Sequence, residues 1–284
     1  MHKTNRLVLA AAVVLSLMTL GALAADEAKP EKKDALSVEG STTVGPIADA
    51  YAEYFQKLYP ALKITVKNTG SGNGITALID GRCDLATSSR FMKAEEFKKA
   101  VEKGILPVAH TIAMDGLCIA VNPANSILGL STAQIKDLYT GKVKNWKEVG
   151  GPDMEVVVIS RDTASGTYEA FNEMVMKKEK MADAVQAVSS SKEVHDRVST
   201  TKGAIGYVGL GFLDEKVKGL NVDGVTPTKK TIVSGKYPLS RPLFVFTNGY
   251  PALGGLVHEF CTLHLSEKGQ KMIEAKGYVP VTDY

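Results

Sequence analysis

The sequence predicts an α/β fold, because apolar runs typical of strands alternate with segments at helical spacing. Residues 36–40, 62–66 and 155–159 are short runs in which apolar residues alternate or cluster, as in buried strands. Each is followed by a polar loop and then by apolar residues spaced as on a helix face. This alternation favours mostly parallel sheets, in which ligands bind beyond the carboxyl ends of the strands. Function is therefore expected in the loops between strand ends and helix starts.

In the first third of the chain, three predicted strands lead into polar loops. These strands cover residues 36–40, 62–66 and 84–90. The helices after them start near Pro46, Ile75 and Lys93, and Pro46 suits a first helical turn because that turn needs no N–H from it. The glycines of residues 69–74 allow close approach to a ligand, although they match no nucleotide-loop spacing. The candidate ligands of these loops are Ser41, Thr42, Thr43, Ser71, Ser89 and Arg90.

The later part of the chain continues the alternation. Residues 105–113 and 117–121 are predicted as two separate strands, and a capping box at Ser131 predicts a helix after it. Residues 237–242 contain two prolines and are expected to interrupt regular structure before a strand at 243–246. One long helix is expected from about residue 254 to residue 275.

The segment at residues 160–167 is the main candidate for an anion site. It follows a predicted strand, and Ser165, Gly166 and Thr167 open an amphipathic helix. The first N–H groups of a helix have no partner within it and lie at the positive end of its dipole, so they attract anions. Arg161 adds a planar set of donors suited to an oxyanion. From this segment alone, an anion site and a plain serine cap beside a surface arginine both remain open.

Composition bounds the class of protein and its partners. The chain has 284 residues, of which 44% are hydrophobic and 23% charged, so a globular protein of about two domains is expected. Lys3 and Arg6 precede an apolar run at residues 7–20, and residues 22–24 have the small-x-small form of a signal-peptidase site. Residues 1–24 are therefore predicted to be a signal peptide cleaved near Ala24/Ala25, followed by a flexible leader at residues 25–35 and a periplasmic mature chain.

Without Lys3 and Arg6, the chain has 32 basic and 31 acidic residues. This near-neutral balance argues against nucleic acid or an anionic membrane as a partner. The odd number of cysteines allows at most one disulfide, and we expect buried free thiols at Cys83, Cys118 and Cys261. Because the sequence carries no metal-ligand spacing and no activated nucleophile motif, we expect no metal, no cofactor and no enzyme activity.

Several of these segments, in this order, resemble the substrate-binding protein of the bacterial phosphate ABC transporter. The resemblance extends over about residues 36–281 and is specific because the motifs occur together. They are residues 40–46 (Gly-Ser-Thr-Thr-Val-x-Pro), 70–74 (Gly-Ser-Gly-x-Gly), 84–90 (Asp-x-x-x-Ser-Ser-Arg), 145–146 (Asn-Trp), 161–167 (Arg-x-x-x-Ser-Gly-Thr) and 203–207 (Gly-Ala-Ile-Gly-Tyr).

The resemblance implies a type II periplasmic-binding-protein-like fold, in which two α/β lobes joined by a two-segment hinge close over phosphate in an interlobe cleft. It implies lobe 1 at residues 36–118 and 244–284, lobe 2 at residues 119–243, and delivery of phosphate by a monomer to an ABC transporter membrane permease. The implied phosphate ligands are Thr42 with its neighbours, Ser71, Arg161, Ser165, Gly166 and Thr167.

Ser89 departs from the pattern of some relatives, which have an aspartate there. That carboxylate accepts a hydrogen bond from protonated phosphate and repels fully ionised sulfate, whereas serine repels sulfate less. The Ser-Ser-Arg form nevertheless resembles a recognised subgroup, so phosphate is the first expectation. A receptor for sulfate, molybdate or tungstate, a phosphate sensor module and a secreted phosphatase are the alternatives.

Overall fold

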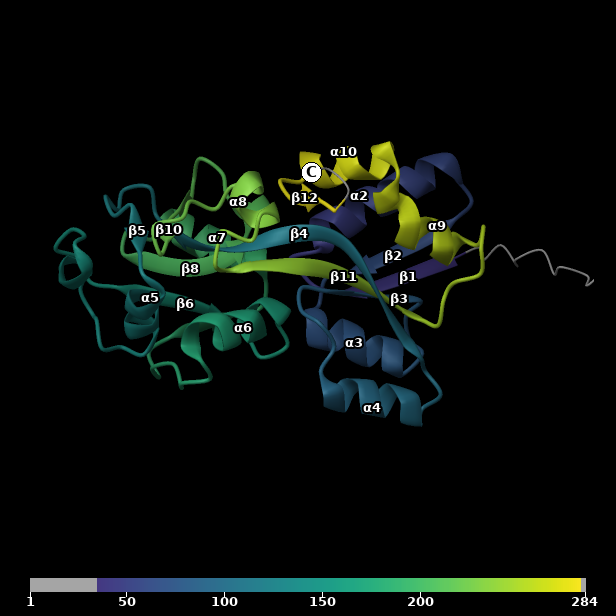
Figure 1. Ribbon diagram of the computed structural model, residues 1–284, viewed down its shortest axis with the longest axis horizontal. Coiled ribbons are helices and arrows are strands. Elements are labelled where there is room, and N and C mark those ends of the chain that lie inside the picture. Colours follow the sequence, from purple (N-terminus) through teal and green to yellow (C-terminus); the bar gives the residue numbers. More distant parts are fainter. Residues whose placement is uncertain (1–34, 282–284) are drawn as a thin grey trace, which may run out of the picture. The chain divides into compact units, whose positions relative to one another are not determined.

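The computed structural model describes residues 35–281, and the expected signal peptide with nearly all of the expected leader lies outside this part. Its centre is a ten-stranded mixed sheet with the path β2-β1-β3-β11-β4-β8-β6-β7, in which β9 and β12 also pair with β4 (Figure 1). The strands of this sheet are β1 (Ala35–Gly40), β2 (Lys63–Lys67), β3 (Leu85–Ser88), β4 (Pro107–Val121), β6 (Val157–Arg161), β7 (Gln186–Val188), β8 (Ala204–Gly209), β9 (Lys218–Gly219), β11 (Ser240–Asn248) and β12 (Val279–Pro280). A separate pair joins β5 (Gly129–Leu130) and β10 (Asn221–Val222).

Helices cover both faces of the sheet, as an α/β fold requires. The helices are α2 (Gly45–Leu58), α3 (Ser71–Ile79), α4 (Ala94–Glu102), α5 (Thr132–Tyr139), α6 (Gly166–Phe171), α7 (Ser191–Thr200), α8 (Lys229–Val233), α9 (Leu256–Thr262) and α10 (Glu267–Ala275). Figure 1 places α2, α9 and α10 on one face beside β1 to β3, and α3 and α4 on the other. None of the helices within residues 35–281 is long and apolar enough to span a membrane.

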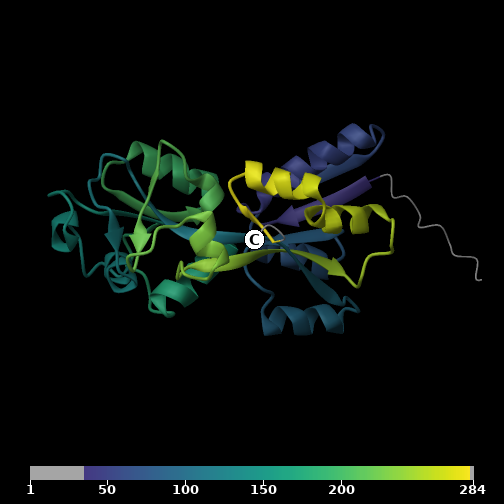
Figure 2. The ribbon, with the colours of Figure 1, turned by 45° about the horizontal axis from the view of Figure 1, so that its top comes forward.

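Two neighbouring strands, β4 and β11, lie where the chain passes between the two halves of the sheet, and β4 pairs with strands of both halves (Figure 2). We call the elements β1 to β3, α2 to α4, α9 and α10 the first half, and β6 to β8 with α5 to α8 the second half. Antiparallel β4 pairs with β11 from Pro107 to Gly116 and then with β8 from Leu117 to Val121. The halves have separate buried cores, because Ile112 and Leu243 pack within the first half whereas Leu117 and Leu239 pack within the second.

The structure corrects several expectations about regular elements. The two strands expected around Gly116 are one strand, β4, since Gly116 continues the pairing with β11. The expected break at residues 237–242 ends at Ser240, where β11 begins. The expected long C-terminal helix is divided into α9, a 3-10 turn and α10, because Ser266 caps a new helix by accepting from the N–H of Gly269. Parallel and antiparallel pairs also mix, because β4 and β11 run against their neighbours.

Other expectations about the scaffold are confirmed. Ser131 Oγ accepts from the N–H of Gln134, and the Gln134 side chain accepts from the N–H of Ser131, so the predicted capping box opens α5. The three cysteines are buried free thiols, and burial raises the pKa of Cys83 to about 12. Such thiols are poor nucleophiles and serve as small core residues.

Candidate functional site

The loops singled out by the sequence meet where the two halves face each other, and hydroxyl groups form a buried cluster there. Thr167 is its centre, with its Oγ1 2.9 Å from Thr43 Oγ1 and 3.3 Å from Ser89 Oγ. Ser89 Oγ is in turn 3.3 Å from Ser71 Oγ. These four side chains are at most 1% exposed. Because a hydroxyl can donate as well as accept, such a cluster can turn several donors toward one oxyanion.

The Ser165 loop begins α6 as the sequence predicts. Ser165 Oγ accepts from the N–H of Tyr168, which leaves its own O–H able to donate elsewhere. Gly166 lies so close to the first half that a Cβ on it would come within 2.4 Å of Ser71 Oγ. The helix start therefore brings its backbone directly to the hydroxyls of Ser71 and Ser89, at a separation that only glycine permits.

Arg161, at the end of β6, is 2% exposed and is held by the loop before α7. Its guanidinium donates to the carbonyl of Val188 (3.2 Å), the carbonyl of Ser189 (2.8 Å) and Ser191 Oγ (3.1 Å). No carboxylate of the described residues forms an ion pair with it, and burial lowers its pKa. A buried cation without an ion-pair partner is costly, so this position favours an anion.

Two of the motifs that carry the resemblance, residues 145–146 and 203–207, pack behind Arg161 and do not contact the hydroxyl cluster. Tyr207 Oη lies 2.7 Å from Ser160 Oγ and accepts from the N–H of Arg161 at 3.1 Å. Trp146, fully buried, donates from Nε1 to the carbonyl of Gly203 at 2.9 Å, next to the strand that carries Tyr207. This buried indole is therefore a packing anchor of the second half.

Residues 70–74 differ from the expected open loop, because α3 starts at Ser71 and includes the later glycines. Gly70, with φ of 107°, caps this helix in a conformation that favours glycine. A Cβ on Gly74 would meet the carbonyl oxygen of Glu39 at 2.5 Å, so glycine lets α3 pack directly on β1. Gly72 donates its N–H to the carbonyl of Ala164 across the two halves at 3.0 Å.

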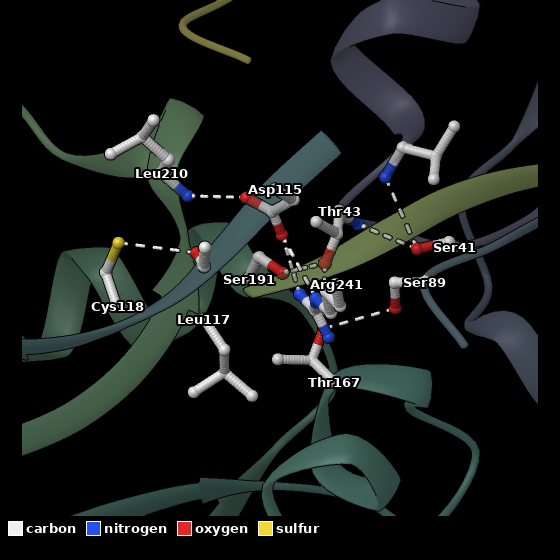
Figure 3. Close-up of polar contacts among 12 residues, drawn as sticks. Ser41, Thr43, Ser89, Asp115, Leu117, Cys118, Thr167, Ser191, Leu210 and Arg241 are labelled. Carbon is white, nitrogen blue, oxygen red and sulfur yellow. Dashed lines mark hydrogen bonds and ion pairs between the residues drawn. The ribbon is translucent and has the colours of Figure 1, made fainter. Parts of the chain in front are cut away.

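Ser41 and Thr42 lie on the first-half side of the cluster. Ser41 Oγ accepts from the N–H groups of Thr43 and Val44, so it orders the turn before α2 (Figure 3). Thr42 Oγ1 lies 3.2 Å from Ser191 Oγ and accepts from the N–H of Ser191 at 3.3 Å. Both side chains are buried, and Thr42 contacts the opposite half directly.

Arg90 was also a candidate ligand, but the structure places its guanidinium away from the hydroxyl cluster. It forms ion pairs with Glu96 at 2.6 Å and with Glu169, and Glu169 also pairs with Lys93. Glu169 lies on α6, whereas Arg90 and Lys93 lie between β3 and α4, so this network joins the two halves. These two carboxylates pair with the charge of Arg90, which therefore offers little positive charge to an anion.

Sequence reasoning missed three buried polar residues at the cluster: Ser191, Asp115 and Arg241. Ser191 Oγ lies 3.3 Å from Thr43 Oγ1 and links it to Arg161. Arg241 donates to Asp115 Oδ2 from Nε (3.1 Å) and Nη2 (2.9 Å), and Nη2 also donates to Thr167 Oγ1 (Figure 3). The serine run before α7 was a usable signal, because it repeats the pattern of hydroxyls between a strand and a helix.

Comparison with known proteins agrees with this architecture. Residues 25–268 match the family described as PBP superfamily domain. The chain is 36% identical over 262 residues to the phosphate-binding protein PstS of Bacillus subtilis, covering 91% of this chain and 85% of that protein. It is 38% identical to the PstS of Staphylococcus epidermidis RP62A, covering 85% of this chain and 77% of that protein.

Solved structures of phosphate-binding proteins are similar to this chain in fold and in sequence. A putative phosphate ABC transporter substrate-binding protein with bound phosphate from Clostridium perfringens superposes with a TM-score of 0.80 at 34% identity, covering 87% of this chain and all of that one (100%). An ABC-type phosphate transport receptor from Vibrio cholerae has a TM-score of 0.70 at 31% identity, covering 86% of this chain and 99% of that one.

Proposed function

This chain belongs to the PBP superfamily and to the family of the phosphate-binding protein PstS, and from that premise we propose that it binds inorganic phosphate and delivers it to an ABC-type membrane permease for uptake. The observation that carries the proposal is buried Arg161, which has no ion-pair partner among the described residues and lies beside the hydroxyl cluster. A tetrahedral oxyanion needs several donors from different directions, and the cluster supplies them from both halves.

The proposed ligands come from both halves of the sheet. The first half contributes the loop at residues 41–43 with Ser71 and Ser89, and the second contributes Arg161 with residues 165–167. Arg90 is left out of the ligand set, because Glu96 and Glu169 hold its guanidinium. We propose that Arg90 instead stabilises the two halves in contact through Glu169.

The proposed lobes are residues 36–118 with 244–284, and residues 119–243. Two observations support this division: β4 changes its partner from β11 to β8 at Leu117, and the core changes between Leu239 and Leu243. We propose that β4 and β11 form the two-segment hinge. Hinges absorb motion at a few positions while each lobe keeps its own core, which is the arrangement these two strands provide.

The remaining proposals concern compartment and chemistry. We propose an exported, periplasmic, monomeric protein without enzyme activity. The predicted signal peptide supports export, and the hydroxyl and arginine donors of the cluster suit binding of an anion. Ser165 Oγ bonds to the N–H of Tyr168 rather than to a base, so among the described residues nothing activates it as a nucleophile. A chromogenic phosphate ester incubated with the pure protein would reveal hydrolysis if this were wrong.

Deleting the gene is expected to abolish high-affinity phosphate uptake, because the permease would lose the receptor that delivers its substrate. The measurement is the uptake of radioactive phosphate at low external concentration, with the parent gene restored as the control. If uptake were normal in the deletion strain while the pure protein still bound phosphate, the protein would be a sensor rather than a transport receptor.

A further inference from the structure

Two buried arginines, rather than one, lie at the hydroxyl cluster, and the second is on the hinge. Arg241 is 5% exposed and lies on β11, opposite Asp115 on β4 in the register of the two strands. Asp115 lies two residues before Leu117, where β4 begins to pair with the second half. Its position on the crossing strands places Arg241 between the two proposed lobes, facing Thr167 (Figure 3).

The donors of Arg241 are only partly used. Nε and Nη2 donate to Asp115 Oδ2, and Nη2 also reaches Thr167 Oγ1 at 3.1 Å. Nη1 is buried and has no hydrogen-bond partner within residues 35–281. Buried donors are almost always bonded, so an unpartnered guanidinium N–H beside a hydroxyl cluster indicates that a ligand belongs there.

Asp115 holds Arg241 in place without competing for the ligand. Its Oδ1 accepts from the N–H of Leu210 at 2.8 Å, and its Oδ2 accepts from Arg241. Each carboxylate oxygen of Asp115 therefore already accepts from a donor of the protein.

The charges of the site also favour a second cationic ligand. A chain of hydroxyls connects the guanidinium of Arg161 through Ser191, Thr43 and Thr167 to that of Arg241. Burial is the main cause that lowers the pKa of Arg161, and the positive charge of Arg241 lowers it further, as expected for two buried cations close together. Among the described residues, the buried Asp, Glu, Lys and Arg side chains are Asp115, Arg161 and Arg241, and their net charge is positive. An anion between the two arginines would relieve their repulsion.

We propose that Arg241 is a direct second arginine ligand of the bound phosphate, donating from Nη1, and that Asp115 is the positioning residue that orients it. The inference rests on the proposed function, since it concerns the same bound ion. Because Arg241 belongs to the hinge strand β11, this contact would tie the bound phosphate to the hinge itself as well as to both lobes.

The test compares two variants with the parent after bound phosphate has been removed. Arg241→Gln alone leaves Asp115 buried without its partner and would disturb folding, so the decisive variant is the double change Asp115→Asn with Arg241→Gln, which keeps the net charge. We expect it to bind phosphate about 20-fold more weakly in calorimetry, since a charge-assisted bond is lost. Ser240→Ala, on the same strand, is the matched control and should bind as the parent does.

A crystal structure of the parent protein with phosphate gives a second readout that needs no variant. The inference requires Arg241 Nη1 at about 2.7–3.1 Å from a phosphate oxygen. It is overturned if phosphate is bound but Nη1 contacts none of its oxygens, or if the folded double variant binds as tightly as the parent. If the parent binds no phosphate at all, the proposed function itself is wrong and the inference falls with it.

Discussion

Replacing Arg161 with alanine is expected to weaken phosphate binding by about 1000-fold. The change removes the buried cation that lacks an ion-pair partner among the described residues, and breaking a buried charge pair costs about 3–5 kcal/mol. Ser165→Ala should cost less, about tenfold, because it removes a neutral donor and a helix cap. Calorimetric titration of each phosphate-free variant measures both effects.

Two further variants separate the charge of Arg161 from its geometry. Arg161→Lys keeps the charge but loses the planar donors that reach Val188, Ser189 and Ser191, so an intermediate affinity is expected. Arg82→Ala removes an exposed arginine and serves as the control. Parent-like phosphate affinity in Arg161→Ala would contradict the proposed site.

Replacing Gly166 with alanine is expected to weaken phosphate binding by about 100-fold while changing the stability of the phosphate-free protein little. The new Cβ would lie 2.4 Å from Ser71 Oγ, 2.8 Å from Ser71 Cβ and 2.9 Å from Ser89 Oγ, so these two ligand side chains or the contact between the halves must shift. Overpacking of this kind costs about 1–3 kcal/mol. Alanine suits the first turn of α6, so folding itself is not opposed.

Gly72→Ala is the matched control for this contact. It also lies where the halves meet, but its Cβ would be 3.4 Å from the carbonyl oxygen of Ala164, an ordinary contact. Calorimetry gives the affinity and thermal unfolding without phosphate gives the stability. If Gly166→Ala bound phosphate like the parent, close contact between the halves would not be required for binding.

The sequence predicts the loops of this site better than the connections between its two halves. Hydroxyl groups between a strand and a helix are local features, so Ser41, Ser71 and Ser165 could be recognised from their neighbours along the chain. The resemblance to phosphate receptors then predicted that these loops contribute to one phosphate site. The ligand set itself stays a prediction until a bound ion is observed.

The missed and misplaced residues depend on contacts between distant segments. Arg90 looked like a donor beside Ser89, but its partner Glu169 lies on α6, far along the chain. Asp115 and Arg241 meet only because β4 and β11 run side by side, and the prolines around Arg241 concealed that strand. A lone charge within an apolar run was the available signal, since such residues are rarely buried unless they are paired.

The central claim is that this site binds phosphate in preference to other tetrahedral oxyanions, and a competition series on the pure, phosphate-free protein tests it most directly. Phosphate, sulfate, molybdate and tungstate are titrated by calorimetry, alone and against one another. The account predicts tight binding of one phosphate per chain that the other anions displace only weakly. No heat with phosphate, together with binding of sulfate, molybdate or tungstate, would contradict it.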